Sequence, residues 1–278
     1  MRLSQGCRVG SRVSRAARAC ALLAAVLAAA VAAGCAASSP GEVVPASGQP
    51  VTRQYDMTGF TGVKLDSGLI AAVMYDDGYA AAVTVDESVA EYLVAEVDGD
   101  TLHIGLQPGK VYSGLTFRVT VTLPQLRALE VTGGARARVY GFASSDPLSL
   151  TISGGGIAAL SGVEAGDVTA DVSGAAGLGG DLKARTLTGA VSGSSRIGVT
   201  GSAESAVLDA SGGSNLDLGT FTIGDLQVHL SGGSRGTVVV TGTLDADASG
   251  GSQLEYGGSP TLGDVNATGG SHIGRMGE

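Results

Sequence analysis

A Ser/Thr-Gly pair recurs through the second half of the chain at a nearly fixed interval, and this repeat limits the fold more than any other feature. The first residues of the pairs are Thr132, Ser153, Ser173, Ser192, Ser211, Ser231, Ser249 and Thr268. The length of chain between successive pairs hardly changes along this series. A unit of about 20 residues cannot bury an apolar side alone, so such repeats are typical of solenoids, in which each unit stacks on its neighbours.

The residues before each pair alternate between apolar and polar, as at Leu150 and Ile152 with Thr151 between them. Alternation of this kind predicts a half-buried strand. A second short strand follows the glycine, as at Ile197 and Val199, and further glycines close it. A leucine-rich horseshoe has repeats of similar length but needs a Leu and Asn framework that is missing here. The sequence therefore predicts an all-β fold, a single-stranded parallel β-helix (solenoid) of about eight short coils, each made of two or three strands.

The turn chemistry supports stacking at a corner. The glycine after each hydroxyl residue suits a left-handed backbone conformation, which other residues adopt at a cost of about 1–2 kcal/mol. The hydroxyls are expected to form a ladder that bonds the turn backbones. A second ladder is suggested three places on, at Ser195, Ser214, Ser234, Ser252 and Ser271.

Residues 51–131 have longer strands and are expected to form an N-terminal β cap and the first coils, ahead of the glycine-rich repeats at 132–278. The expected strands are Gly62–Ser67, Leu69–Tyr75, Tyr79–Val85, Thr101–Leu106 and Leu115–Leu123. One short helical turn is expected over Glu87–Val94. A cap is needed because an open end of a solenoid exposes unpaired strand edges.

Composition agrees with a folded chain that turns often. The 278 residues include 46 glycines, 44% hydrophobic residues, only 4% aromatic residues and no Trp. A disordered polar chain lacks this apolar content, so we expect a core of small aliphatic side chains.

Residues 1–34 have the pattern of a secretory signal peptide. Five arginines and no acidic residue precede an apolar run over 19–33, which is shorter than the ~20 residues of a membrane-spanning helix. The run ends in Ala32-Ala33-Gly34-Cys35, which resembles the lipobox of bacterial lipoproteins, although that pattern prefers Leu where Ala32 stands. The resemblance implies cleavage before Cys35 and a lipid on its sulfur, which would place the protein on the extracytoplasmic face of the cell membrane.

The segment after Cys35 and the net charge indicate how the folded part is presented. Residues 35–50 are rich in Ala, Ser, Gly and Pro and are expected to form a flexible tether. Without the five leader arginines the chain has 12 basic and 26 acidic residues. Such an acidic body is repelled by nucleic acid and by anionic lipid head groups, so the expected membrane contact is the lipid anchor alone.

Several short motifs outside the repeats resemble the head GIN domain family, which is described as auto-transporter adhesins. They are Phe60-Thr61-Gly62-Val63, Asp66-Ser67-Gly68, Thr101-Leu102-His103-Ile104 and 119–126, which reads VTVTLPQL. The resemblance covers roughly residues 53–273. It implies an all-β solenoid on a bacterial lipoprotein and brings no catalytic motif.

An enzyme is the main alternative, because many polysaccharide lyases and hydrolases are parallel β-helices. Such sites need clustered carboxylates and aromatic side chains for sugars, whereas Phe221 and Tyr256 stand alone on the repeats and the histidines are scattered. Asp217 ends a segment similar to a calcium-binding repeat. The following units place Thr237, Glu255 and Gly274 at the same position, so the series that such a site needs is broken and no metal or cofactor is expected.

Two columns of outward residues are the candidate binding surfaces. Acids two places before the hydroxyl occupy alternate units, at Glu130, Asp171, Asp209 and Asp247, with Ala190 among the residues between them. Arginines four places after the hydroxyl form a sparser column of Arg136, Arg196 and Arg235. For the acids, spacing of charge for stability is favoured over a cation- or ligand-binding face. For the arginines, a partner surface and solvation of an edge are the two interpretations. The expected function is a non-enzymatic surface module for binding or adhesion, with a glycan or an envelope protein as ligand.

Overall fold

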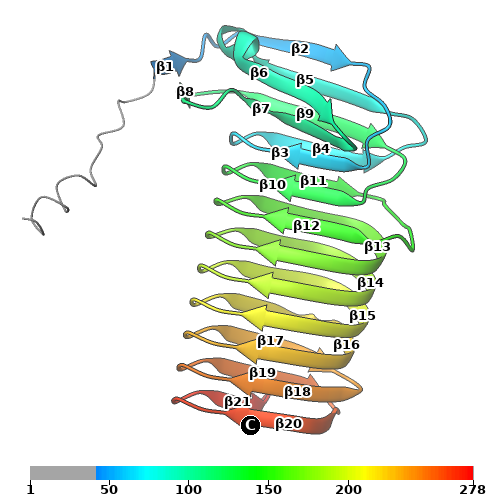
Figure 1. Cartoon of the computed structure of the whole chain (residues 1–278), viewed down its shortest axis with the longest axis vertical. Coiled ribbons are helices and arrows are strands. Elements are labelled where there is room, and N and C mark those ends of the chain that lie inside the picture. The colour runs from blue at the N-terminus through cyan, green and yellow to red at the C-terminus, as the bar shows by residue number, and fades with distance from the viewer. Residues whose placement is uncertain (1–41, 278) are drawn as a thin grey trace, which may run out of the picture. The chain divides into compact units, whose positions relative to one another are not determined.

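The computed structural model describes residues 42–277, and the chain from Val43 onward forms one compact unit (Figure 1). This unit is a β-solenoid of about seven turns, which confirms the predicted all-β parallel fold. The predicted signal peptide and Cys35 lie outside the described residues.

The solenoid has two main faces, joined on one side by the Ser/Thr-Gly corners. On the first face the order at the N-terminal end is β2 (Pro50–Tyr55), β5 (Ala80–Asp86), β9 (Phe117–Leu123), β4 (Ile70–Tyr75) and β11 (Arg136–Tyr140). On the second face the order is β6 (Leu93–Asp98), β7 (Thr101–Leu106), β3 (Gly62–Leu65), β10 (Ala128–Val131) and β12 (Leu148–Ile152).

The middle coils each consist of one long strand that bends from the first face to the second. These strands are β13 (Ile157–Val172), β14 (Gly177–Val191), β15 (Arg196–Ala210) and β16 (Asn215–Leu230). The prediction of two or three separate strands per unit is wrong here, because hydrogen bonding to the next coil continues around the bend. Gly180 and Gly201 lie at this bend with φ of +106° and +117°. Glycine turns the backbone there without breaking the ladder.

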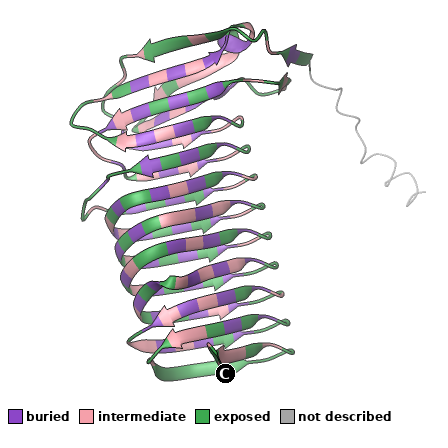
Figure 2. Cartoon of the chain, turned by 180° about the vertical axis from the view of Figure 1, so that it is seen from behind, coloured by how far each residue is buried: buried purple, intermediate pink, exposed green. Residues whose placement is uncertain are grey.

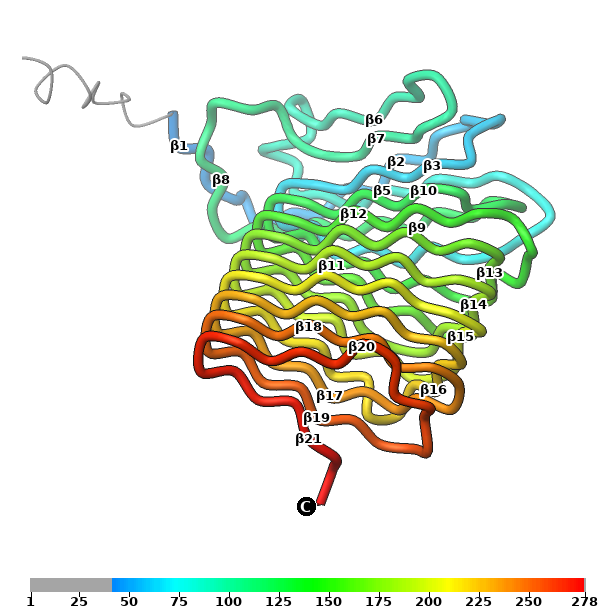
Figure 3. Tube along the Cα trace, turned by 60° about the horizontal axis from the view of Figure 1, so that its bottom comes forward, coloured from blue at the N-terminus to red at the C-terminus, as the bar shows by residue number. Residues whose placement is uncertain are grey.

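The last coils again have a separate strand on each face. They are β17 (Arg235–Val240), β18 (Thr243–Ala248), β19 (Gln253–Gly258), β20 (Thr261–Ala267) and β21 (His272–Arg275). Pairing between neighbouring coils is parallel throughout this region, and Figure 3 shows each coil following the path of the previous one.

The predicted left-handed corner is confirmed at every repeat. The glycines that follow the hydroxyl residues all have φ between +58° and +67°. The next residue is left-handed too, and it is glycine except at Ala175 and Ser194, both with φ of +68°. Two left-handed residues in succession make a type I′ turn. The backbone amide of the second left-handed residue also donates a hydrogen bond to the next corner. The Gly155 amide, for example, donates to the Gly174 carbonyl at 3.1 Å.

The hydroxyl ladder that stabilises the corner is the second one suggested by the sequence. Ser195, Ser214, Ser234 and Ser252 are at most 1% exposed. The hydroxyls of Ser214, Ser234 and Ser252 donate to the carbonyl three residues earlier at 2.5–2.8 Å. In contrast, the hydroxyls of the first ladder make no side-chain hydrogen bond within residues 42–277. They are half-buried or exposed at the turn, where water can satisfy them, so the prediction that they bond the turn is wrong.

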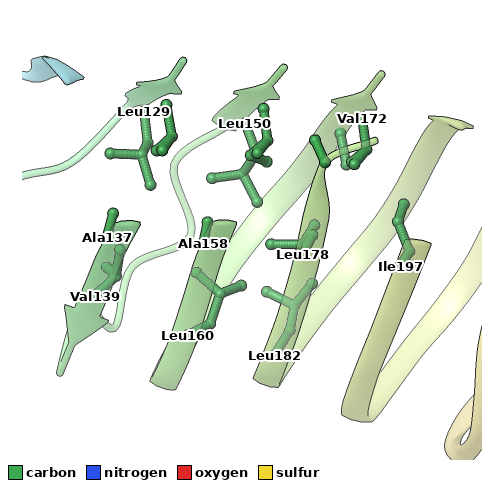
Figure 4. Close-up of a cluster of buried hydrophobic side chains, with 14 of the residues drawn as sticks. Leu129, Ala137, Val139, Leu150, Ala158, Leu160, Val172, Leu178, Leu182 and Ile197 are labelled. Carbon is green, nitrogen blue, oxygen red and sulfur yellow. The ribbon is translucent and has the colours of Figure 1, made fainter. Parts of the chain in front are cut away.

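The core between the faces is aliphatic, as the composition predicts. Buried and exposed residues alternate along the strands (Figure 2). Leu129, Leu150 and Val172 from the second face meet Val139 and Leu160 from the first (Figure 4). Small inward side chains keep this layer thin.

The strands before the repeats pair in both directions. β5 is antiparallel to both β2 and β9, and β6 is antiparallel to β7. The five strands expected here are present with ends shifted by a few residues, and the helical turn is a 3-10 helix at Glu87–Tyr92. Strands β2, β6, β1 (Glu42–Pro45) and β8 (Lys110–Ser113) were not predicted. A capping role for this part stays a prediction.

The folded unit begins earlier than the composition suggests. Val44 is buried, and Ala46 donates a backbone hydrogen bond to Ser113 at 3.1 Å. Asp86, which is 2% exposed, accepts from the amide and hydroxyl of Ser47 and from the amide of Gly48 at 2.7–2.8 Å. Residues 43–50 therefore belong to the fold rather than to a flexible tether.

Candidate functional site

The strand pairing places the predicted acids in one outward column on the second face. Neighbouring coils align Glu130, Thr151, Asp171, Ala190, Asp209, His229, Asp247 and Asn266 in that order. We call this set the acid column. Its members come from the position two residues before each corner, where the side chain points away from the core.

Basic side chains contact several acids of the acid column. The Lys64 ammonium lies 2.9 Å from the Glu130 carboxylate. The His229 ring lies between two acids, 3.4 Å from Asp209 and 3.3 Å from Asp247. These contacts favour the interpretation of the column as charge spacing along the stack.

The predicted arginines also share a column, on the outward side of the first face. We call this side the arginine face. Its column runs through Arg118, Ile70, Arg136, Ile157, Gly177, Arg196, Asn215, Arg235, Gln253 and His272. Arg196 forms an ion pair with Asp217 on the next coil, whereas Arg136 and Arg235 form none within residues 42–277.

The arginine face contains an open hollow of about 440 Å³ over β9, β4 and β11. Arg118, Arg136 and Arg138 line it, together with Ile70, Ala72 and Tyr140. Arg138 follows Arg136 by two residues on the same strand and so points to the same side. We call these residues the arginine groove.

Sequence reasoning found only one of the three arginines of this groove. The alternation in β11 was a signal that would have found Arg138. Arg118 could not be placed from the sequence, because its position depends on pairing between β9 and β4, two strands that are far apart in the chain.

A second hollow of about 440 Å³ lies where the chain crosses between the faces, on the side away from the corners. Its carboxylates are Asp146 and Glu164. Asp146 accepts from the Ser144 hydroxyl at 2.8 Å and from the Gln125 amide, and these bonds, the first above all, lower the pKa of Asp146 below its usual range. Glu164 lies 3.4 Å from the Lys183 ammonium. Asp146 is therefore held in the charged form, and Glu164 has a basic neighbour.

The histidines do not gather. His103 contacts Asp66 at 2.7 Å, His229 lies in the acid column, and His272 is on the last strand. Within the described part of the chain, no three His, Cys, Asp or Glu side chains are placed to share a metal ion. The pairing also aligns Asp217 with Thr237, Glu255 and Gly274, the column that the sequence predicted to be unsuited to a calcium series.

The predicted anchor residue, Cys35, lies outside the described residues. From Glu42 to Gly277, no helix is long and apolar enough to cross a membrane.

Comparison with solved structures finds the same fold in bacterial proteins. A "putative lipid binding protein" from Parabacteroides distasonis has a TM-score of 0.79 at 17% identity, covering 84% of this chain and 100% of its own. A "putative adhesin" from Parabacteroides merdae has a TM-score of 0.76 at 19% identity, with 84% and 99% covered. A second "putative adhesin" from P. distasonis has a TM-score of 0.77 at 20% identity, with 84% and 100% covered. At these identities the likeness concerns the fold.

No curated protein matches the sequence of this chain. The family model described as "Putative auto-transporter adhesin, head GIN domain" matches residues 59–260, which is most of the chain and includes the arginine groove and the acid column as far as Asp247. The protein is thus a member of the head GIN domain family.

Proposed function

We propose that this protein is a non-enzymatic binding module, held by a lipid on Cys35 at the extracytoplasmic face of the cell membrane. The observation that carries the proposal is the regular display of outward side chains. Coils stacked at ~4.8 Å fix these side chains in columns that run along the solenoid. A rigid surface of this kind binds an extended ligand with little loss of conformational entropy on the protein side.

The family and the names of its structural relatives support a binding role. The family description names adhesins, and the solved relatives are named as adhesins or as a lipid binding protein. The partnered carboxylates of the hollow around Asp146 support a non-enzymatic role, since a glycosidase needs two acids free to act as general acid and base or nucleophile.

Of the two predicted surfaces, the arginine face is the better binding surface. Most acids of the acid column have a basic neighbour, whereas Arg136 and Arg235 keep their charge available. The ligand would be a glycan or an envelope protein that contacts this face across several coils.

Three measurements test the proposal together. When cells that express the Cys35→Ser variant are fractionated, the protein should be found in the soluble extracytoplasmic fraction instead of the membrane fraction. The chain from Val43 onward should retain ligands from a glycan array or an envelope extract. The same protein should leave polysaccharides at their original length. A Cys35→Ser variant that stays in the membrane contradicts the anchor, and shortening of a polysaccharide contradicts the non-enzymatic role.

A further inference from the structure

The arginine groove concentrates positive charge in an acidic protein. The chain outside its leader has only 12 basic residues against 26 acidic ones, and three of the 12 line this one hollow. Arg118 and Arg136 flank Ile70 on the two neighbouring strands, so their Cα atoms are about 10 Å apart across two ladder spacings. Arg138 lies beside them, opposite Ala72.

These arginines have no ion-pair partner within residues 42–277, unlike several basic residues of the repeats. Lys183 pairs with Glu164 and Arg185 with Asp167 across neighbouring coils. The outward positions of β9, β4 and β11 contain no acid at all. Three like charges this close repel one another, and the fold leaves that repulsion uncompensated. An external anion would remove it.

The floor of the groove is apolar and shallow. Ile70 is 52% exposed between the two flanking arginines, and Tyr140 is 37% exposed at the end of the same strand as Arg136. A smaller hollow of about 320 Å³ follows on the next coils of the arginine face. It is lined by Ile157, Ala159 and several glycines, with Arg196 at its side. The two hollows thus lie on neighbouring coils along one trough-like row, and this arrangement suits an extended chain better than a compact small molecule.

We propose that the arginine groove binds a segment of an acidic polysaccharide, whose carboxylate or phosphate groups pair with Arg118, Arg136 and Arg138. This inference rests on the proposed binding function and names its ligand. A guanidinium group binds such anions through two parallel hydrogen bonds. The rings of the sugar chain would lie against Ile70 and Tyr140, where an aromatic face and an aliphatic side chain are open to contact.

A polysaccharide fits this groove better than a peptide or a bilayer does. The backbone groups of β4 are already paired on both sides, with β9 and β11, so a peptide cannot add as a strand here. An anionic bilayer presents a broad surface to a protein whose net charge is strongly negative, and repulsion outweighs three local contacts. A single polymer chain enters the trough and avoids the acidic surfaces.

Binding of polygalacturonate oligosaccharides by the chain from Val43 onward tests the proposal, measured by calorimetry with neutral dextran oligosaccharides as the ligand control. This part of the chain contains every buried side chain of the described structure. We expect Arg118→Gln/Arg136→Gln to weaken binding at least about 10-fold, which corresponds to about 1.4 kcal/mol. The matched control is Arg53→Gln/Arg275→Gln, which removes the same charge at exposed positions outside the groove. It should change affinity less than about twofold.

Each other outcome overturns the proposal. Equal losses in the two double variants would show non-specific attraction. Binding of phosphatidylglycerol vesicles without binding of the oligosaccharide would assign the groove to a lipid surface. Binding of a different ligand that survives Arg118→Gln/Arg136→Gln would leave the general binding function standing and remove this site. Shortening of the oligosaccharide would instead contradict the non-enzymatic function itself.

Discussion

From the middle coils to the C-terminal end, each coil pairs with the coil before it and the coil after it, whereas the strands before them pair over long distances in the sequence. β3, for example, pairs with both β7 and β10, so that Thr101 of β7 and Ala128 of β10 both align with Gly62. In the repeats the same corner is made again in every coil. The two regions therefore differ in what fixes them, a repeated local turn in one and particular long-range pairings in the other.

This difference extends to charge. Several basic side chains of the repeats pair with acids one coil away, as Arg185 does with Asp167 and Arg196 with Asp217. The three arginines of the groove lie where the two regions meet, with Arg118 on β9 and the others on β11. A regular stack repeats its compensating neighbours, and a junction between two kinds of pairing has no such repetition. The junction is where the structure gathers several such charges in one place.

The largest expected loss of stability comes from substituting a glycine that lies against the backbone of the adjacent coil, as opposed to a glycine that is needed only for a left-handed turn. In Gly180→Ala the new β-carbon would lie 2.7 Å from the Leu160 nitrogen on the adjacent coil and closer still to its oxygen, at a φ of +106°. Backbone held by ladders on both sides cannot move away, so we expect a loss of at least about 3 kcal/mol in the free energy of unfolding. Denaturant titration measures it.

Gly59→Ala is the matched control for that change in the N-terminal region. Gly59 has a φ of +82° but open space around the β-carbon position. Only the left-handed strain remains, at about 1 kcal/mol. Similar losses at the two positions would mean that close stacking of coils does not limit substitution at the bend.

The second expected effect compares the two hydroxyl ladders. Ser234→Ala removes the 2.7 Å bond to the Ser231 carbonyl at a corner where Ser234 is fully buried, and the carbonyl keeps only the longer 3.3 Å bond from the Ser234 amide. The loss should cost about 1 kcal/mol. Ser231→Ala removes an exposed hydroxyl and should cost less than about 0.5 kcal/mol. A lower unfolding temperature for Ser231→Ala than for Ser234→Ala would show that the ladder of Ser231, not that of Ser234, stabilises the corner.

The sequence located both hydroxyl positions but assigned the bonding to the wrong one. Period and glycine placement predict where a corner is, since only glycine suits its first left-handed position. Which hydroxyl faces inward depends on how the chain enters the corner. Ser234 and Ser231 are the same residue type three places apart, and only the turn geometry makes one buried and the other exposed.

The first segment of the N-terminal region is expected to show a pH effect through Asp86. The hydrogen bonds from Ser47, followed by those from Ser88, hold the pKa of Asp86 well below its usual range. A carboxylate with a depressed pKa stabilises the fold above its unfolded pKa of about 4, and this contribution is lost as the pH falls further. Protection of the Gly48 amide from hydrogen exchange should therefore be strong at neutral pH and decrease below about pH 4.

Asp86→Asn tests this assignment, because the amide nitrogen of Asn cannot accept the 2.8 Å bond from Gly48 that the second carboxylate oxygen accepts. Exchange at Gly48 should become faster at neutral pH and lose its dependence on acid, while the corner amide of Gly155 should be unchanged. Faster exchange at both amides would mean that Asp86 supports the whole unit rather than its first segment.

Much of the fold and part of the site could be predicted because stacking converts sequence position into spatial position. Asp171 and Asp209 could be placed in one column from their distance to the corner alone. Arg118 could not, since β9 belongs to no repeat. The partners of charged residues were also hidden, because the pairing of Arg196 with Asp217 depends on a diagonal contact between coils that the repeat does not specify.

The smallest expected effect tests the column alignment by charge. Ala190 aligns with Asp171 on one side and with Asp209 on the other, so Ala190→Asp creates two contacts between like charges at about 5 Å. Each costs about 1 kcal/mol or less at an exposed position. Alternate acids about 10 Å apart are already screened at physiological salt, which has a screening length of about 8 Å. Ala190→Asp should therefore lower stability at low salt, and added salt should restore much of the loss.

Ala190→Asn keeps the shape without the charge and should be nearly neutral, as Asn266 already occupies the column. If unfolding in denaturant shows the same stability for both variants at every salt concentration, repulsion along the column is negligible, and the spacing of acids on alternate coils has no role in stability.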